Sequence, residues 1–587
     1  MARLQNGCRT AHGRLQLVVL AVPLAWLGFV VCGASLLGPV ATALAQPPNG
    51  PAPNNPAPNN PTPSNPTPSN SIAGAAEQDQ PKSAGTESSS QAHDQSGPAA
   101  GDAVERAPSG LAVAAALQES VVAAVDRAGK SVVAIARVRK SGRNFRTPDE
   151  LRDPLQFDSS TIGFLPDMNP TSPDFVPNEF ASGIILDREG HIVTNYHVLG
   201  DPQKNDYFVW VQKRPFKVVR VDTPPEVKAG DPWTDLAVLK ISASDLEPMP
   251  LGDAASLKKG MFVIALGNPY GIARDGEVSA TWGIVSNLQR AVAEPQSGSN
   301  GGDPGTLGQY GTLIQTDARL ELGTSGGALV NLQGEMVGLT TSLAAKAGYE
   351  QSAGFAIPVD DAFRRTVDTL RQGRVPAFGF LGVQPDHLPL ADRQAGRFGA
   401  RVLRVVPGTP GHKAGLREND VITHVNQVRV FDKSSLFREL SRLPADDAVQ
   451  LTVERRDNPR DPPRTVTTMA VLSKKYMSEL HPAYAQVPEP TWRGMVLEYP
   501  SALPPELGAQ AVQAADGDNC VAVADVVRDS PAWRAGMRRG EFISQVGTQR
   551  VLTPRQFHAA VASLDGEVRL SVVANGTAVA ERVVAAR

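Results

Sequence analysis

The chain has 587 residues, of which 41% are apolar, and its formal net charge is -3. This length predicts about three or four domains, and the near-neutral charge gives no reason to expect a nucleic-acid partner. Of the three cysteines, only Cys520 lies outside the N-terminal region, which excludes a disulfide framework and a cysteine-ligated zinc site for the body of the protein.

The N-terminus has the pattern of an export signal. Arginines precede an uncharged apolar run from Leu15 to about Ala45, whose small-x-small end favours cleavage after Ala45. The run is also longer than the ~18 residues that span a bilayer, so an uncleaved inner-membrane anchor over residues 15–37 stays an alternative. No Lys or Arg occurs from Leu15 to Pro81, and both alternatives therefore place the body outside the cytoplasm, in the periplasm or cell envelope.

Residues 46–110 follow this signal peptide or anchor, which we assign to residues 1–45. They include Pro- and Asn-rich five-residue units between Pro51 and Asn70 and then a stretch rich in Ser, Gln and Gly. Such a composition cannot bury a core, so we expect a disordered, extended linker.

Residues 111–373 read as a β domain. A helix is expected over residues 111–125, and a Pro- and Asp-rich loop over residues 141–179. Around that loop the apolar, β-branched runs predict strands at residues 131–135, 183–186, 191–194, 207–211, 236–239, 262–265 and 283–286. Many short strands without long helices between them indicate an antiparallel barrel or sandwich.

The last third contains an internal repeat. Thr409-Pro410 and Ala414-Gly415-Leu416 recur 121 positions later as Ser530-Pro531 and Ala535-Gly536-Met537. A constant offset predicts two copies of one module, at residues 376–473 and 490–587. Each copy reads as strand, turn, short helix, strand, helix and strands.

The motif Gly323-Thr324-Ser325-Gly326-Gly327 is a candidate catalytic turn. Glycines around a serine let the backbone approach a substrate and direct N–H groups to one side, as an oxyanion site needs. A plain Gly-rich turn is the alternative. The spacing also fits the nucleophile elbow of α/β-hydrolases, but strand and turn follow Ser325 instead of a helix, and no histidine follows before Pro376.

A histidine and an aspartate precede this serine in the order His, Asp, Ser. His197 ends the apolar stretch that begins at Ile192, and Asp235 begins the stretch to Ile241. Alone, each residue would have a structural interpretation. Together with Ser325 they favour a catalytic triad.

The motifs Thr194-Asn195-x-His197-Val198, Thr234-Asp235-Leu236-Ala237-Val238 and Gly323-x-Ser325-Gly326-Gly327 strongly resemble the HtrA/Deg family of trypsin-like serine proteases. This resemblance implies a mainly β fold: a chymotrypsin/trypsin-like double β-barrel protease domain at residues 111–373, followed by two α+β PDZ domains.

The resemblance also implies site residues. Ser325 is expected as the nucleophile, His197 as the general base and Asp235 as the residue that orients the imidazole, with the N–H groups of Gly323 and Ser325 forming the oxyanion hole. The wall of the specificity pocket would be Phe355, Ala356 and Ile357. Because this wall is apolar and carries no acid, we expect cleavage after small or medium aliphatic residues.

Two positions depart from the family pattern. The family usually has Asn before the catalytic serine and Pro two residues before that Asn, whereas this chain has Thr324 and Leu322. A β-branched residue is stiffer than Asn and tolerates unusual backbone angles less well. We therefore expect an oxyanion hole that forms less readily, or only when a ligand orders the loop. The long Gly/Ser-rich loop over residues 290–309 is a candidate regulatory element.

A PDZ domain binds a C-terminal peptide as an added strand and holds its carboxylate with backbone N–H groups. In the first copy, the resemblance places this loop at Phe380, Leu381, Gly382 and Val383, facing a helix over residues 435–443. The second copy matches less well at Trp492-Arg493-Gly494-Met495, with an insertion expected over residues 497–519. Two small packing domains with closed grooves are the alternative.

These features predict an exported, ATP-independent serine endopeptidase that degrades unfolded or damaged envelope proteins and acts by an acyl-enzyme mechanism. No cofactor or metal is expected, and the resemblance implies a homotrimer or a multiple of trimers. Two other hypotheses stay open. One is a peptide-binding chaperone or scaffold with a silent or rarely activated protease domain, and the other is a membrane-anchored, site-specific regulatory protease.

Overall fold

The computed structural model describes residues 110–139, 179–213, 217–220, 226–268, 278–290, 313–321, 323–341, 353–458, 461–477, 483–504, 507, 520–574 and 578–586. The expected signal or anchor at residues 15–37, most of the expected linker, Leu322 and the loop over residues 291–309 lie outside these ranges. Within the described ranges, none of the helices has both the length and the hydropathy of a bilayer span.

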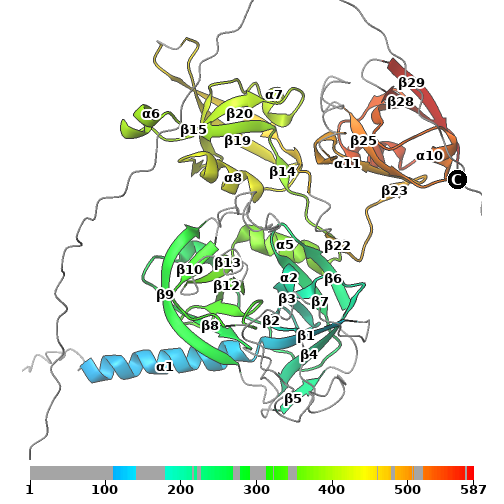
Figure 1. Ribbon diagram of the computed structural model, residues 1–587. Helices are drawn as coiled ribbons and strands as arrows, with labels where there is room; N and C mark the ends of the chain where they lie inside the picture. The colour runs from blue at the N-terminus through cyan, green and yellow to red at the C-terminus, as the bar shows by residue number, and fades with distance from the viewer. Residues whose placement is uncertain are drawn as a thin grey trace, which may run out of the picture. The chain divides into compact units, whose positions relative to one another are not determined.

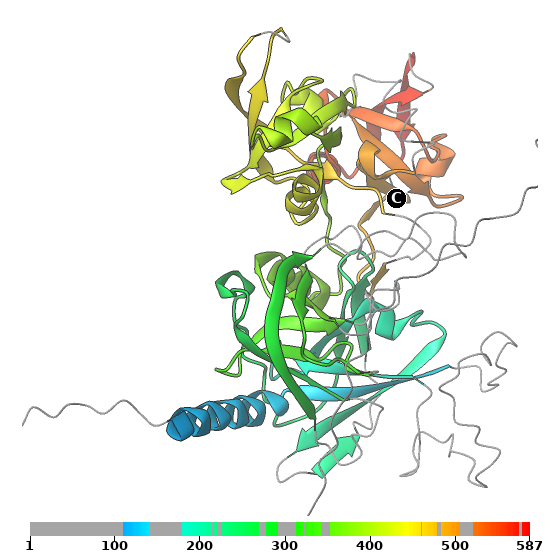
Figure 2. The same cartoon turned by 60° about the vertical axis from the view of Figure 1, so that its left-hand side comes forward.

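Helix α1 (Gly110–Gly129) begins the described chain and is slightly longer than expected. Only its C-terminal part is buried, at Ala124, Ala128 and Gly129. Its first turns expose apolar side chains such as Leu111, and both views show the helix extending beyond the strands that follow it (Figures 1 and 2).

The first sheet of the protease region is antiparallel, in the order β22-β6-β7-β3-β2-β1-β4-β5. Its strands have these bounds: β1 (Val132–Arg139), β2 (Glu179–Ile185), β3 (His191–Asn195), β4 (Asn205–Lys213), β5 (Lys217–Arg220), β6 (Glu226–Asp231), β7 (Leu236–Lys240) and β22 (Tyr484–Ala485). The inclusion of β22 was not foreseen, because it comes from the segment between the two repeats and pairs with β6.

The second sheet is a closed barrel in the order β10-β13-β12-β11-β8-β9 (Figure 1). Its strands are β8 (Phe262–Gly267), β9 (Ser279–Arg290), β10 (Leu313–Thr316), β11 (Ala328–Val330), β12 (Met336–Thr341) and β13 (Gly354–Pro358). The expected antiparallel architecture is confirmed. Helix α5 (Asp361–Arg371) follows β13 and begins at Asp360, whose side chain accepts from the Phe363 N–H group.

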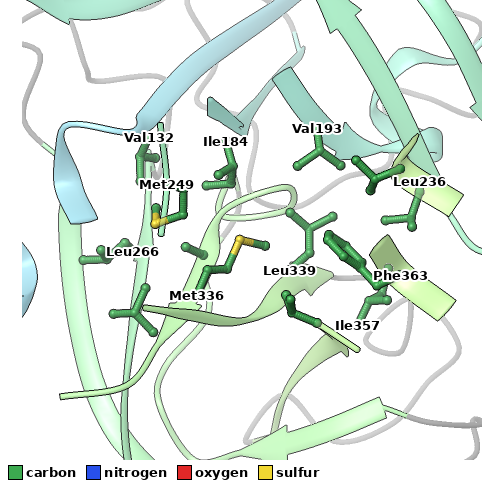
Figure 3. Close-up of a cluster of buried hydrophobic side chains, with 14 of the residues drawn as sticks. Val132, Ile184, Val193, Leu236, Met249, Leu266, Met336, Leu339, Ile357 and Phe363 are labelled. Carbon is green, nitrogen blue, oxygen red and sulfur yellow. The ribbon is translucent and has the colours of Figure 1, made fainter. Parts of the chain in front are cut away.

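The main core of the protease region lies between these two sheets. Successive residues of a strand point to opposite faces, so Val193 joins this shared core while its neighbour Ile192 packs into the first sheet's own interior. Figure 3 shows Ile184 and Val193 from the first sheet facing Met336 and Leu339 from the second barrel. This packing fixes the two sheets relative to each other.

The two repeats form similar modules, each with its own core. The first contains β14 (Gly379–Phe380), β15 (Val383–His387), α6 (Leu390–Gln394), β16 (Ala400–Val405), α7 (Pro410–Lys413), β17 (Val421–Val425), β18 (Val428–Arg429), α8 (Lys433–Ser441), β19 (Ala448–Arg455), β20 (Arg464–Val471) and β21 (Ser473–Lys474). The second contains β23 (Thr491–Trp492), β24 (Met495–Glu498), β25 (Val521–Val526), α10 (Pro531–Arg534), β26 (Phe542–Val546), β27 (Gln549–Arg550), α11 (Pro554–Val561), β28 (Val568–Ala574) and β29 (Ala578–Val584).

The repeat predicted from the offset of 121 positions is confirmed by matching elements. Helix α7 corresponds to α10, and α8 to α11. The expected start of the insertion at Leu497 is wrong, because Leu497 and Glu498 belong to β24 and pair with β25.

Candidate active site

His197 lies in the single helical turn α2 (Tyr196–Leu199), directly after β3. Strand β3 pairs with β7 so that Asn195 lies opposite Leu236. This register brings the turn next to Asp235, whose carbonyl accepts from the Tyr196 N–H group at 2.9 Å. The local fold of two neighbouring strands therefore positions both residues.

The imidazole of His197 is held by a buried carboxylate. Its Nδ1 lies 2.9 Å from Oδ2 and 3.0 Å from Oδ1 of Asp235, and the His197 backbone N–H donates to Oδ1 at 3.0 Å. The Asp235 side chain is 1% exposed. With Nδ1 occupied by the carboxylate, Nε2 is the ring nitrogen that can take a proton from a nucleophile.

A second buried aspartate shapes the turn before Asp235. Asp231 accepts from the Thr234 N–H group at 3.0 Å and from the Thr234 hydroxyl at 2.6 Å, and also from the Trp233 N–H group. Burial raises the pKa of Asp231 to about 6. Asp235 itself has a positive φ of 56°, unusual for a residue other than Gly, so this turn depends on such support. The sequence analysis did not single out Asp231, although an Asp three residues before a Thr is a common turn signal.

Ser325 lies in the turn that leads into β11 and is 7% exposed. Its carbonyl accepts from the Ser182 N–H group at 2.9 Å. The next residue, Gly326, has φ +81°, and a Cβ there would lie 2.2 Å from the Ser182 carbonyl oxygen and 2.4 Å from Oγ1 of Thr194. Only Gly allows this turn to approach β2 and β3, the strand that ends at the His197 turn.

Two neighbouring threonines of β12 join this turn to Asp235. The Gly326 N–H group donates to the Thr340 carbonyl at 2.9 Å, and the Thr340 hydroxyl donates to the Thr324 carbonyl at 2.5 Å. The hydroxyl of Thr341 donates to Oδ2 of Asp235 at 3.2 Å. The residues around Ser325 and those around Asp235 thus share one hydrogen-bonded network.

The turn before Ser325 has the backbone that its glycines predict. Gly323 has φ +97°, and a Cβ there would lie 2.6 Å from the Asn268 carbonyl oxygen. Thr324 does not have a positive φ, and its hydroxyl donates to the Glu321 carbonyl at 2.7 Å. A β-branched residue is therefore not strained at this position, because the backbone of Thr324 does not have a positive φ.

The residues expected at the specificity pocket are all buried in β13. Phe355 and Ile357 pack into the core between the two sheets, and Ala356 packs into the interior of the closed barrel. Their role in substrate selection stays a prediction.

The expected peptide loop of the first module joins β14 to β15. Phe380 pairs with Ser473, Leu381 is buried in the module core, and Gly382 has φ +79°. A Cβ at Gly382 would lie 2.1 Å from Oγ1 of Thr409, so only Gly fits there. No described residue accepts from the backbone N–H groups of Leu381 and Gly382.

Within the part of the chain that the structure describes, no group of three or more His, Cys, Asp or Glu residues could hold a metal ion. The candidate site described above consists of one imidazole, carboxylates, hydroxyls and main-chain amides.

Three family models match separate regions of this chain, one for a peptidase domain and two for PDZ domains. Residues 181–339 match the trypsin-like peptidase domain, and residues 379–462 and 523–574 each match a PDZ domain. The chain is 32% identical over 403 residues to a probable periplasmic serine endoprotease, DegP-like, of Chlamydia trachomatis, covering 68% of this chain and 73% of the relative. It is 28% identical over 416 residues to the periplasmic pH-dependent serine endoprotease DegQ of Escherichia coli, covering 70% and 81%.

Among solved structures, the chain is similar to an HtrA-type protease, AlgW, with a decapeptide. The identity is 26% and the TM-score is 0.41, with 61% of this chain and 99% of the other covered.

Proposed function

Since this chain belongs to the DegP/HtrA family of serine endopeptidases, we propose that it degrades unfolded or damaged proteins of the cell envelope, outside the cytoplasm and without ATP. The proposal includes the domain limits given above: a protease at residues 111–373 and PDZ domains at residues 376–473 and 490–587. The periplasmic names of the relatives support the location.

The contact between His197 and Asp235 is the observation that carries the catalytic assignment. In the proposed mechanism His197 Nε2 takes the proton of the Ser325 hydroxyl, which is a weak nucleophile without a base. Ser325 Oγ then bonds to the scissile carbonyl carbon. Asp235 keeps the imidazole in the required tautomer and stabilises the imidazolium. His197 next gives the proton to the leaving amine, and water hydrolyses the acyl-enzyme by the same route.

The developing oxyanion would be bound by the N–H groups of Gly323 and Ser325. Main-chain donors that are fixed before the reaction stabilise the charge of the tetrahedral intermediate. The positive φ of Gly323 and the hydrogen bond from the Ser182 hydroxyl to the Gly323 carbonyl, at 2.8 Å, support a preformed turn. The segment Phe355, Ala356 and Ile357 carries no acid, and a specificity pocket with this strand as its wall would favour small or medium aliphatic residues before the cleaved bond.

The first PDZ module is the proposed peptide-binding one. The N–H groups of Leu381 and Gly382 would bind a terminal carboxylate, and a peptide would add to the outer edge of β15, whose only strand partner in its described sheet is β16. Leu436 and Leu440 of α8 belong to the apolar core of the module behind this edge. Unfolded chains with apolar C-termini are the proposed ligands of this edge. A trimer, or a multiple of trimers, is part of the proposal by family resemblance.

Ser325→Ala tests the proposal on an unfolded substrate such as casein. We expect wild type to cleave casein and the variant to fall to background while its fold, measured by circular dichroism, is unchanged. Equal and negligible cleavage by both proteins, with both suppressing aggregation, would instead support the chaperone or scaffold hypothesis. Cleavage of one native membrane protein but not of casein would support the site-specific regulatory protease.

A further inference from the structure

The turn that carries Asp235 contacts the first PDZ module. Trp233, two residues before Asp235, is only 5% exposed. Its indole ring lies 6.2 Å from the Phe378 ring, centroid to centroid. The Lys475 Nζ atom lies 3.5 Å from the centroid of the same indole, a cation–π distance.

These two partners stand at the two ends of the first PDZ module. Phe378 directly precedes β14, and Lys475 directly follows β21. The Lys475 N–H group donates to the Phe378 carbonyl at 2.8 Å, which continues the pairing of β14 with β21. The two residues are therefore joined by a main-chain hydrogen bond. Phe378 also belongs to the main protease core, and the chain continues from it through β14 to the peptide loop at Leu381 and Gly382.

Trp233 is connected to the catalytic residues by the turn itself. Its N–H group donates to Asp231, whose carboxylate also holds Thr234, the residue before Asp235. On the other side of Asp231, Gly230 pairs with Tyr484 of β22, the segment that follows the first module. Displacement of the indole would therefore be transmitted through two residues to the carboxylate that orients His197.

The indole has no polar role in this arrangement. Trp233 Nε1 is buried and has no hydrogen-bond partner among the described residues. A buried donor without a partner is unfavourable, so the ring contacts must account for the placement of the side chain. A Phe at this position would keep an aromatic ring against Phe378 and Lys475 and lose only the part of the packing that the larger indole provides.

We propose that Trp233 is a positioning residue, through which the Phe378–Lys475 pair of the first PDZ module holds the Asp235 turn in its catalytic conformation. The inference rests on the proposed function of His197, Asp235 and Ser325. It adds that the rate of peptide-bond cleavage depends on the packing of this indole against the Phe378–Lys475 pair, through the carboxylate of the triad.

The test compares Trp233→Ala, Trp233→Phe and Lys475→Met in the full chain, with a chromogenic peptide substrate. Competent sites are counted by titration with a fluorophosphonate, so kcat is expressed per folded active site and lost protein does not lower it. We expect Trp233→Ala to lower kcat roughly ten- to a hundred-fold with KM nearly unchanged, because misplacement of a supporting group slows chemistry more than binding. Trp233→Phe should stay within about two-fold of wild type. Lys475→Met keeps the aliphatic stem and should lower kcat by roughly two- to five-fold.

A kcat of Trp233→Ala within two-fold of wild type would overturn the proposal, as would an equal loss in Trp233→Phe and Trp233→Ala. If Trp233→Ala does not fold, Lys475→Met decides, since this half-buried side chain can be changed without opening the core. An unchanged kcat in Lys475→Met would then overturn it. Ser325→Ala distinguishes a failure of this inference from a failure of the proposed function. Residual cleavage in that variant would contradict the proposed function itself, whatever the result for Trp233.

Discussion

The two PDZ modules share a fold but differ at the loop where a peptide carboxylate would bind. In the first module the loop leads from β14, which pairs with β21, into β15. In the second module Arg493 and Gly494 have φ values of +49° and +89° and form a two-residue turn, so β23 folds back and pairs with β24. Among the strands that the structure describes, none pairs with β15 at the edge where a peptide would add, whereas β23 covers the corresponding edge of β24.

The side chains strengthen this difference. Leu381 of the first module packs into the core, whereas Arg493, at the corresponding place, donates to carbonyl groups near the C-terminal end. Trp492 packs against Phe557 of α11, with ring centroids 5.3 Å apart. In the second module an aromatic pair therefore packs between β23 and α11. In the proposed function the first module is the peptide receptor and the second is a packing unit, and the residues beside one glycine distinguish the two.

Arg493→Leu should have the largest effect and sharpens the comparison directly. The guanidinium donates to four carbonyl groups, those of Leu564, Gly566, Val584 and Ala585. Since Arg493 is only 6% exposed and each hydrogen bond of a charged group contributes about 1.5–3 kcal/mol, we expect the second module to lose at least about 3 kcal/mol of stability. Hydrogen exchange followed by mass spectrometry would show that the amides of β25 to β29 lose protection. The amides of β15 to β20, in the first module, should keep theirs.

Arg538→Leu is the matched control for that prediction. Arg538 belongs to the same module but is exposed and stacks on Trp533 at 3.8 Å. Its replacement should change stability by less than about 1 kcal/mol. Unchanged protection of β28 and β29 in Arg493→Leu would show that the guanidinium does not hold the module together.

Gly382→Ala and Gly494→Ala form a pair that separates stability from binding. A Cβ would lie 2.1 Å from Oγ1 of Thr409 in the first case and 2.2 Å from Cβ of Ser530 in the second. Both variants should lose about 2–3 kcal/mol, since a positive φ and a contact this close are each unfavourable. Only Gly382→Ala should lose affinity for a labelled peptide with a free C-terminal Val, measured by fluorescence polarisation.

Gly396→Ala supplies the control for the backbone alone, because its φ is +78° and nothing lies within 4 Å of the added Cβ. It should cost about 1 kcal/mol and leave binding unchanged. If Gly494→Ala also lost affinity for the peptide, the second module would take part in binding and the proposed difference between the two modules would be wrong.

Trp492→Ala should destabilise the second module by about 1–2 kcal/mol, because a half-buried ring is lost. It should not create a second peptide site, since β23 still covers the edge of β24. Calorimetry with the same peptide would give one site per chain for wild type and variant. A stoichiometry of two in wild type would contradict the assignment of a covered edge.

Glu498→Gln should have the smallest effect, at the contact between the modules. Burial raises the pKa of Glu498 above its ordinary value, although Lys474 Nζ lies 2.7 Å from the carboxylate. The ionised form is thus less favoured in the folded chain, so stability falls as the pH rises from the unfolded pKa through the folded one. We expect the variant to change stability by no more than about 1 kcal/mol at pH 7 and to show a weaker decline above pH 4.5.

The midpoint of urea unfolding between pH 4.5 and pH 7 measures this effect. Glu489→Gln is its control, because that carboxylate is 65% exposed and 3.8 Å from Lys474. If stability depended more steeply on pH in Glu498→Gln than in wild type, burial would not raise the pKa of Glu498 as assigned here.

The sequence predicted the parts of the molecule that depend on local patterns. The strand runs, the repeat at an offset of 121 positions and the motifs around His197, Asp235 and Ser325 all lie in short stretches with their own signals. The register of β3 on β7 then brings His197 to Asp235 without further information. Most of these strands are buried on both faces, so they are predictable as short apolar, β-branched runs bounded by turns and not by alternation.

Other features depend on contacts between distant segments and had no local signal. Nothing in Tyr484 and Ala485 indicates that they extend the protease sheet, since the pairing is decided by β6, more than two hundred residues earlier. The buried role of Arg493 depends on carbonyl groups near the end of the chain. The contact of Trp233 with Phe378 likewise joins two regions that the sequence analysis treated as separate domains.

Labelling with a fluorophosphonate tests the central assignment most directly. We expect one adduct per wild-type chain, mapped by peptide mass spectrometry to Ser325, and a labelling rate that falls by several orders of magnitude in His197→Ala. An adduct on another serine, or labelling of Ser325 at the same rate without the imidazole, would contradict the proposed catalytic site.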